Sequence, residues 1–168
     1  EEVKILCEGA QGFELDIDWG DYPFVTSSHC TTAGALLNAI PPSWIKEVWG
    51  VGKVYETYVG AKNFEPPHPN FSRLRELGEE YGATTGRPRQ CNWLDLSRLR
   101  RAIKINGVNK VVLNKTDVLR SLGVYRLINN GANVGFYNFQ EMESYIREDL
   151  GNVNSNIEIY FSDRKDAI

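Results

Sequence analysis

A four-residue motif with recognisable chemistry follows an apolar run in the second half of the chain. Asn114-Lys-Thr-Asp117 comes directly after Val111-Val-Leu113. A carboxylate at Asp117 can accept hydrogen bonds from both the N1–H and the exocyclic amine of guanine, and adenine does not offer that pair of donors. The Lys115 stem can lie over the face of a base, and Asn114 can tie neighbouring loops together. The motif therefore indicates a guanine-nucleotide site, although four residues alone also occur by chance.

A second segment combines glycines, hydroxyls and arginines. Residues 82–89 are Gly-Ala-Thr-Thr-Gly-Arg-Pro-Arg. The glycines let the backbone approach a ligand and let a loop close. Arg87 and Arg89 offer bidentate forks for a carboxylate or phosphate, and the Thr84 and Thr85 hydroxyls can complete the shell of an anion. The segment predicts an anion-binding loop, and the alternative is a surface turn with exposed arginines.

Two shorter segments carry small and neutral polar residues. Glu8-Gly-Ala-Gln-Gly12 includes Gln11, and Val25-Thr-Ser-Ser28 includes Thr26. Their amide and hydroxyl groups suit phosphate oxygens and purine amides, although ordinary turns use the same residues. No GxxxxGK[ST] phosphate loop is present.

Several aspartates, histidines and cysteines could in principle bind a metal or undergo redox chemistry, but a structural role is expected for them. Asp16 and Asp18 can serve a metal or acid–base site, but a turn or hydrogen-bonding role is favoured. His29 lies beside the hydroxyl-rich segment, and His68 is expected to be exposed among prolines. Three widely spaced cysteines without CxxC spacing argue against a zinc site or a disulfide framework, so each is expected to be a small buried hydrophobe. No metal ligand is assigned.

Short apolar runs and capping residues predict the elements that position these motifs. Strands are expected at residues 3–7, 110–114 and 157–161, with a longer alternating run over 48–59. Asp95, Asn138 and Asn70 are each expected to cap a helix. This alternation predicts an α/β fold with a largely parallel central sheet and flanking helices. The polar loops at 8–12, 114–117 and 162–165 would then lie at carboxyl ends of strands, where such sheets bind ligands.

Composition limits the class of protein. The 168 residues are 42% hydrophobic and 24% charged, which is typical of one globular domain without an internal boundary. No apolar stretch approaches a membrane span, and the start of the chain does not resemble a signal peptide. A net charge of −3 argues against a nucleic-acid partner, whereas five arginines and one lysine within 84–104 suit a small anionic ligand. We therefore expect a cytoplasmic protein without nucleic-acid or membrane partners.

Together the motifs resemble one family closely. The matching stretches follow the same order from Val3 to Leu119, and they include 7–18, 22–34 and 81–95. They resemble adenylosuccinate synthetase. The resemblance implies the C-terminal portion of a larger P-loop-like, GTPase-related ligase domain. In this family the γ-phosphate of GTP activates the 6-oxygen of IMP, with Mg²⁺ present, and L-aspartate then displaces the phosphate to form a C–N bond.

The resemblance also implies roles for individual residues. The purine nucleotide would be held by Gln11, Gly12, Thr26, Val59, Gly60 and Arg87. Aspartate would be held by Thr84, Thr85, Arg87 and Arg89. The base of the triphosphate would be held by Lys115, Asp117 and Ser162. No catalytic residue is assigned, and the Mg²⁺ ligands are expected outside this chain or on the substrates.

The sequence also departs from the family pattern. The family's phosphate loop and catalytic aspartate and histidine are not among these 168 residues, so we expect an incomplete active site and a homodimer that includes the missing portion. The segment after Asp117 is short, as in archaeal and bacteriophage-type members, with a compact helix at 139–150. Tyr58 replaces the usual arginine, and the loop after Phe161 lacks the usual Thr-Gly-Pro. Two alternatives remain open: a bacteriophage-type synthase that joins aspartate to dGMP using ATP or dATP, and a non-catalytic GTP-binding module.

Overall fold

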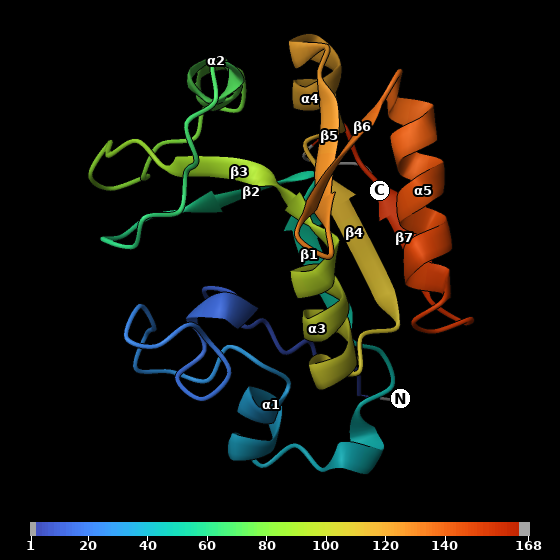
Figure 1. Ribbon diagram of the computed structural model, residues 1–168. Helices are drawn as coiled ribbons and strands as arrows, with labels where there is room; N and C mark the ends of the chain where they lie inside the picture. Colours follow the sequence, from blue (N-terminus) through green and yellow to red (C-terminus); the bar gives the residue numbers. More distant parts are fainter. Residues whose placement is uncertain (1–2, 165–168) are drawn as a thin grey trace.

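The computed structural model describes residues 3–164 and arranges them as an α/β fold with two sheets (Figure 1). A parallel sheet has the order β1-β4-β7, and a mixed sheet has the order β2-β3-β5-β6. The strands are β1 (Trp49–Lys53), β2 (Tyr55–Tyr58), β3 (Gln90–Asp95), β4 (Lys110–Asn114), β5 (Tyr125–Asn129), β6 (Ala132–Phe136) and β7 (Glu158–Phe161). The parallel sheet and its flanking helices confirm the predicted fold class, and the mixed sheet was not anticipated.

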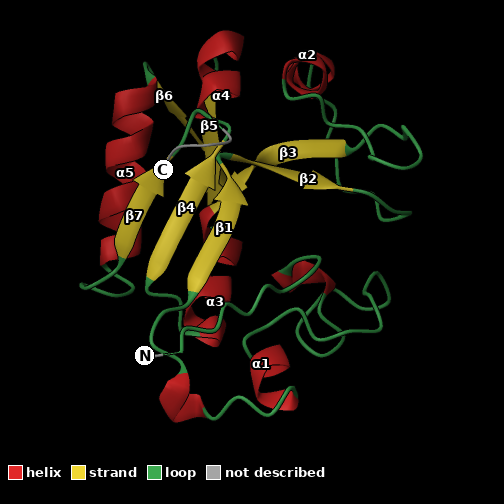
Figure 2. Ribbon diagram, turned by 180° about the vertical axis from the view of Figure 1, so that it is seen from behind, coloured by secondary structure: helices red, strands yellow, loops and turns green. Residues whose placement is uncertain are grey.

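The central strand of the parallel sheet is β4, which explains its unbroken apolar run. Val111, Val112 and Leu113 are all buried, as expected for a strand covered on both faces. Figure 2 shows β1, β4 and β7 running in the same direction, with α5 beside β7. The carboxyl ends of these three strands therefore meet at one edge of the sheet.

Capping residues define the two longest helices. In α3 (Leu96–Asn106) the Asp95 carboxylate accepts from the backbone N–H of Ser97 at 2.8 Å. In α5 (Phe139–Gly151) the Asn138 side chain accepts from the backbone N–H of Glu141 at 2.9 Å. Both caps confirm the sequence prediction. The other helical elements are η1 (Phe13–Leu15), α1 (Ala33–Leu37), η2 (Pro42–Trp44), α2 (Asn70–Leu77) and α4 (Thr116–Leu122).

Several predicted elements differ from the structure. Residues 3–7 form no strand: Val3 and Leu6 are 82% and 90% exposed, and no strand in the described part of the chain pairs with them. The run 48–59 divides into β1 and β2, which belong to different sheets. Asn70 is the first residue of α2 rather than its cap, and its backbone N–H donates to His68 Nδ1 at 3.2 Å.

The segment after Asp117 holds more structure than the single helix that was expected. Besides α5 it contains α4 and the antiparallel hairpin β5–β6. The hairpin turns at Asn130-Gly131, where both residues have positive φ, as type I′ turns require. The alternating strands of this hairpin were not recognised in the sequence.

The core lies between the mixed sheet, the parallel sheet and the helices. Its largest fully buried apolar side chains include Tyr55, Phe71, Leu74, Leu96, Leu113, Leu119, Leu127, Met142, Ile146 and Leu150. The N-terminal segment, residues 3–47, is different, since Asp16 is its single fully buried side chain. Figure 1 shows this segment below β2 and β3, away from the carboxyl ends of β1 and β4. No helix within residues 3–164 has the length and apolar character needed to cross a membrane.

Candidate functional site

The Asn114-Lys-Thr-Asp117 motif lies at the carboxyl end of β4, as predicted. Lys115 adopts a left-handed conformation with φ of 66°, which turns the chain from β4 into α4. Asp117 is exposed in the first turn of α4, and Thr116 is buried. The Oδ1 atom of Asn114 is buried and makes no hydrogen bond among the described residues. The strand and turn thus present the Asp117 carboxylate to solvent at the edge of the sheet.

Ser162 follows the adjacent strand β7 and contacts this motif. Its carbonyl oxygen accepts from the Thr116 backbone N–H at 3.2 Å and from the Thr116 hydroxyl at 3.3 Å. Its own N–H donates to Leu113 O at 3.0 Å. Two of the three polar loops predicted at strand ends therefore meet, and Lys115, Asp117 and Ser162 belong to one edge. Lys165 of the final loop lies outside the described residues.

The segment 81–89 forms a closed loop between α2 and β3. Tyr81 and Pro88 form a β-bridge, and the Gly82 N–H donates to Arg87 O at 2.8 Å. Thr84, Thr85 and Arg87 are exposed. The chemistry-bearing side chains therefore lie on an accessible loop whose two arms are held together by the backbone.

The arms of this loop are fixed by side chains that the sequence analysis did not single out. Glu80 forms an ion pair with Arg89 at 3.1 Å. Arg75 donates through Nε to Arg89 O at 2.7 Å and forms an ion pair with Glu65. Glu65 in turn accepts from the Cys91 N–H at 2.6 Å. An acid immediately before a glycine-rich loop was the available clue to Glu80, whereas nothing in the sequence separates Arg75 or Glu65 from ordinary surface charges.

The turn that precedes the loop also contacts the Asn114-Lys-Thr-Asp117 motif. Lys115 Nζ donates to Gly78 O at 3.0 Å, two residues before Glu80. A side chain at Gly78 would force its neighbours to shift, because a β-carbon there would lie 2.4 Å from the Tyr55 hydroxyl. The loop 81–89, which we call the arginine loop, and the Asn114-Lys-Thr-Asp117 motif are therefore linked through one short turn.

In the N-terminal segment the structure brings Gln11 and Thr26 close to each other. Ser28 Oγ donates to Gln11 Oε1 at 3.3 Å and lies 3.4 Å from Thr26 Oγ1. Gln11 has φ of 61°, and Gly12 follows in extended conformation at the start of η1. Since residues 3–7 form no strand, the prediction that residues 8–12 lie at a strand end is wrong. No hydrogen bond among the described residues joins Gln11 or Thr26 to Arg87.

Val59 and Gly60 lie in the loop after β2, where Gln90 holds the backbone. Gln90 Nε2 donates to Gly60 O at 3.2 Å and to Lys62 O at 2.8 Å. Val59 is exposed. An ion pair between Lys62 and Asp21 connects this loop to the N-terminal segment. The predicted purine-nucleotide residues of the two segments thus lie on parts of the chain that are joined by a salt bridge.

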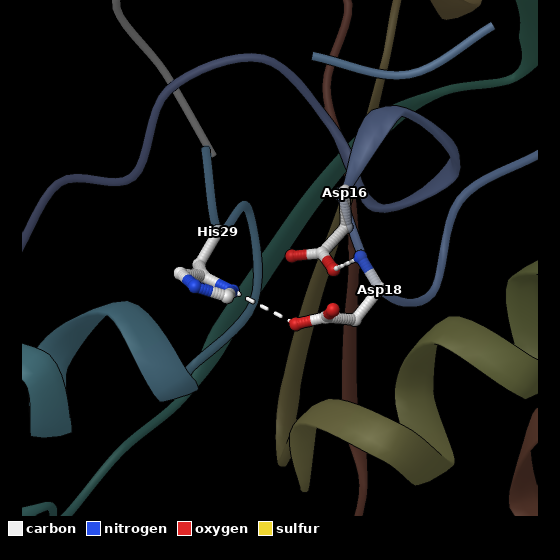
Figure 3. Close-up of side chains that lie close together, drawn as sticks. All are labelled: Asp16, Asp18 and His29. Atoms are coloured by element: carbon white, nitrogen blue, oxygen red, sulfur yellow. Dashed lines mark hydrogen bonds and ion pairs between the residues drawn. The ribbon is translucent and has the colours of Figure 1, made fainter. Parts of the chain in front are cut away.

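Figure 3 shows Asp16, Asp18 and His29, the group of described side chains whose spacing could admit a metal ion. Asp16 is buried, and its carboxylate accepts backbone N–H groups from Asp18, Trp19 and Cys30 at 2.9, 3.0 and 2.6 Å. Burial alone would raise the pKa of Asp16, but these hydrogen bonds outweigh it and hold the pKa below its ordinary value. His29 Nδ1 lies 3.2 Å from Asp18 Oδ2. The favoured turn or hydrogen-bonding role of Asp16 is confirmed.

Other features of the predicted site differ from expectation. Cys91 is buried, and burial raises its pKa to about 11, but Cys7 is exposed rather than buried. His68 is half-buried and packs on Phe71 and Trp93 instead of being exposed. An open hollow of about 690 Å³ beside His68 and Trp93 is lined by none of the predicted binding residues.

Comparisons with known proteins agree on one family. The family described as adenylosuccinate synthetase matches residues 1–130. The adenylosuccinate synthetase of Caldicellulosiruptor bescii is 51% identical over 122 residues, which cover 71% of this chain and 29% of the relative. The chain therefore spans about 29% of the length of this curated relative.

Solved structures show the same relationship. Fully ligated adenylosuccinate synthetase from Plasmodium falciparum aligns with a TM-score of 0.72 and 30% identity, covering 91% of this chain and 46% of that one. Cyanophage S-2L succinoaminodeoxyadenylate synthetase, bound to dGMP and to dATP as an energy donor, aligns with a TM-score of 0.62 and 23% identity, covering 92% and 41%, and this likeness shows the fold. The chain belongs to the adenylosuccinate synthetase family.

Proposed function

We propose that this chain supplies the aspartate- and nucleotide-binding part of a C–N ligase that joins L-aspartate to C6 of a 6-oxopurine nucleotide. In the proposed reaction, GTP phosphorylates the 6-oxygen of IMP, and the aspartate amine then displaces the phosphate to give adenylosuccinate. The 6-oxygen of the purine is a poor leaving group by itself, and it becomes a good one once it is phosphorylated. The observation that carries the proposal is the contact of Lys115 with the turn at Gly78. This contact brings the Asn114-Lys-Thr-Asp117 motif, which is suited to a guanine base, beside the arginine loop.

The geometry of the Asp117 motif supports a role for it in binding the triphosphate base. Asp117 is exposed beyond β4, and Lys115 leaves the strand in a left-handed conformation. We infer that the Asp117 carboxylate accepts the two guanine donors while the Lys115 stem covers the base and the Ser162 loop borders it. The Lys115 amine would have to exchange its contact with Gly78 O for a ligand or for water.

The arginine loop supports aspartate as the second substrate. Arg89 is anchored by Glu80, while no side chain among the described residues holds the Arg87 guanidinium. We infer that Arg87 and Arg89 bind the aspartate carboxylates, with the Thr84 and Thr85 hydroxyls completing the shell. Arg87 would also reach the ribose of the purine nucleotide. Gln11, Gly12, Thr26, Val59 and Gly60 would hold that nucleotide.

Magnesium belongs to the family's chemistry, but the described residues do not fit it. Mg²⁺ prefers six oxygen ligands in octahedral geometry. In the Asp16 group, one ligand is the nitrogen of His29, and the Asp16 oxygens already accept three backbone N–H groups. We therefore assign no Mg²⁺ ligand in residues 3–164 and place the ion on substrate phosphates or on protein outside this chain.

A second substrate pair is favoured by one observation at the nucleotide segment. The Tyr58 hydroxyl lies so close to Gly60 that a β-carbon there would be 2.2 Å away, and the Tyr58 ring packs on Phe64. This bulk beside the proposed ribose segment suits a deoxyribose. The alternative is therefore a synthase that acts on dGMP with ATP or dATP as phosphoryl donor.

The test is a substrate matrix with the full product of the gene that carries this chain. L-Aspartate is supplied with IMP or dGMP and with GTP, ATP or dATP, and the products are separated by chromatography. Turnover with IMP and GTP supports the first reaction, and turnover restricted to dGMP supports the second. Binding of GTP without any turnover would reject both ligase proposals in favour of a non-catalytic GTP-binding module. Sedimentation of the same sample tests the proposed homodimer.

A further inference from the structure

Two carboxylates in the described part of the chain, those of Asp16 and Glu80, are at most 2% exposed, and they have different surroundings. Asp16 is satisfied by the backbone of its own segment, whereas Glu80 joins three distant elements. Glu80 is 2% exposed and directly precedes the arginine loop. Burying a charge costs desolvation free energy unless the charge is paired and hydrogen-bonded, so the contacts around Glu80 must offset that free energy.

The Glu80 carboxylate receives donors from β1, from β2 and from the far arm of the loop. Lys53 Nζ donates to its two oxygens at 2.8 and 2.7 Å. The Tyr55 hydroxyl donates at 2.7 Å, and Arg89 donates at 3.1 Å. The backbone closes the same junction, because the Arg89 N–H donates to Glu80 O at 2.9 Å. Glu80 therefore connects both arms of the loop to the carboxyl end of the parallel sheet.

The charges at this junction favour an ionised Glu80. Burial alone would raise the pKa of Glu80, but the hydrogen bonds from Lys53 and Tyr55 outweigh it and hold the pKa below its ordinary value. For Lys53 burial is the larger effect, and it lowers the pKa of the ammonium despite the Glu80 contact. One carboxylate thus faces two cations, Lys53 and Arg89, and the root of the loop keeps an excess of positive charge.

Arg89 retains hydrogen-bonding capacity after its contact with Glu80. One terminal nitrogen is used by Glu80, while Nε is buried and makes no hydrogen bond among the described residues. The Arg89 side chain is 32% exposed. A guanidinium has five N–H donors, so Arg89 keeps donors for a second anion after the contact with Glu80.

We propose that Glu80 is a positioning residue for aspartate binding, which acts by holding Arg89 and the root of the loop 81–89 in place through Lys53 and Tyr55. This inference rests on the proposed function. Glu80 itself does not touch the substrate. Its carboxylate fixes the direction of the Arg89 fork, while the exposed Arg87 remains able to move onto the ligand.

The test is the substitution Glu80→Gln in the full gene product, with separate measurement of KM for L-aspartate and for both nucleotides. Loss of the charge leaves Lys53 and Arg89 repelling each other, so KM for aspartate should rise about tenfold, the equivalent of one charge-assisted hydrogen bond. KM for the nucleotides should change less than about twofold. Tyr55→Phe removes one donor and keeps the charge, so it should raise KM for aspartate by a smaller factor. The matched control Glu143→Gln breaks the surface ion pair with Arg147 on α5 and should change none of the three KM values.

The outcomes separate the inference from the proposed function. A folded Glu80→Gln protein with unchanged KM for aspartate, or with equal rises in every KM, would overturn the positioning role. If Glu80→Gln does not fold, Tyr55→Phe and Glu80→Asp decide in the same way. Absence of turnover in the unsubstituted protein would instead reject the proposed function. In that case an NMR titration of the chain with L-aspartate decides: weaker binding in Glu80→Gln supports the inference, and unchanged or absent binding rejects it.

Discussion

Glu56 on β2 is a carboxyl group whose ionisation should oppose folding at neutral pH. Its surroundings raise its pKa to about 7, and burial is the main cause. An N–H from Asp95 at 3.1 Å and the Arg98 guanidinium at 3.5 Å favour the charged form, but they do not offset burial. The carboxylates of Asp95 and Glu14 raise the pKa further. Replacing Glu56 by glutamine, which resembles the protonated acid, should therefore stabilise the fold as the pH rises above 4.5, with the full effect above pH 7.

The size of the effect follows from linkage between proton binding and folding. Below the ordinary pKa of 4.5, both the folded and the unfolded state carry a protonated Glu56, and the residue adds no pH dependence. As the pH rises from 4.5 to 7, the unfolded state loses this proton and the folded state keeps it, so stability falls. The complete loss corresponds to about 3 kcal/mol at ~1.4 kcal/mol per pH unit. Glu56→Gln should thus exceed the unsubstituted chain by up to about 3 kcal/mol at pH 8 and match it at pH 4.5.

Urea unfolding followed by tryptophan fluorescence at both pH values measures this difference. The control is Glu143→Gln, since Glu143 forms an exposed i,i+4 pair with Arg147 whose loss should cost about 0.5 kcal/mol or less at pH 8. A Glu56→Gln chain that is less stable than the unsubstituted chain at pH 8 would refute the argument. The same would follow from an advantage that does not change between pH 4.5 and pH 8.

Three further substitutions probe the site. Gly78→Ala places a β-carbon 2.4 Å from the Tyr55 hydroxyl and should cost about 1–3 kcal/mol in urea unfolding, whereas Gly135→Ala, which meets nothing within 4 Å, should cost less. Asp117→Asn should lower the preference for GTP over ATP, measured as the ratio of kcat/KM, by roughly 10–100-fold; an unchanged ratio would exclude Asp117 as the residue that reads the base. Tyr58→Arg should raise kcat/KM for IMP relative to dIMP by about tenfold, the effect of one added charged hydrogen bond. An unchanged ratio would exclude a role for Tyr58 in selecting the ribose.

Elements with strong local determinants could be predicted from the sequence. The caps at Asp95 and Asn138 were correct because the side-chain acceptor and the following apolar stripe are both local features. The strand 110–114 was correct because it is apolar on both faces. The strand at 3–7 was wrong because a strand needs a partner for its backbone, and pairing is not a local property. β3 was missed because its Gln90, Asn92 and Asp95 interrupt the apolar pattern while serving as hydrogen-bonding groups.

The candidate site likewise contains residues that the sequence could place and residues that it could not. Residues of the two motifs at β4 and β7 were placed together by the rule that parallel strands end at one edge, and Ser162 indeed contacts Thr116. The anchors of the arginine loop were not found, because Glu80, Arg75 and Glu65 act through long-range contacts that no spacing reveals. The aspartate, purine and base-binding roles of the predicted residues stay predictions.

The run 48–59 shows how a partly wrong prediction still carries functional information. Its alternation was correct, but the chain leaves the parallel sheet at Val54 and enters the mixed sheet. Alternation survives this change, so Lys53 and Tyr55 both face Glu80 at the root of the arginine loop. Glu56 meets Asp95 and Arg98 instead, and Tyr58 lies against Gly60. One face of the run therefore contacts the root of the proposed aspartate loop, and the other contacts the proposed nucleotide segment. For this reason Glu80→Gln should change the kinetics for aspartate, whereas Tyr58→Arg should change the selection of the nucleotide.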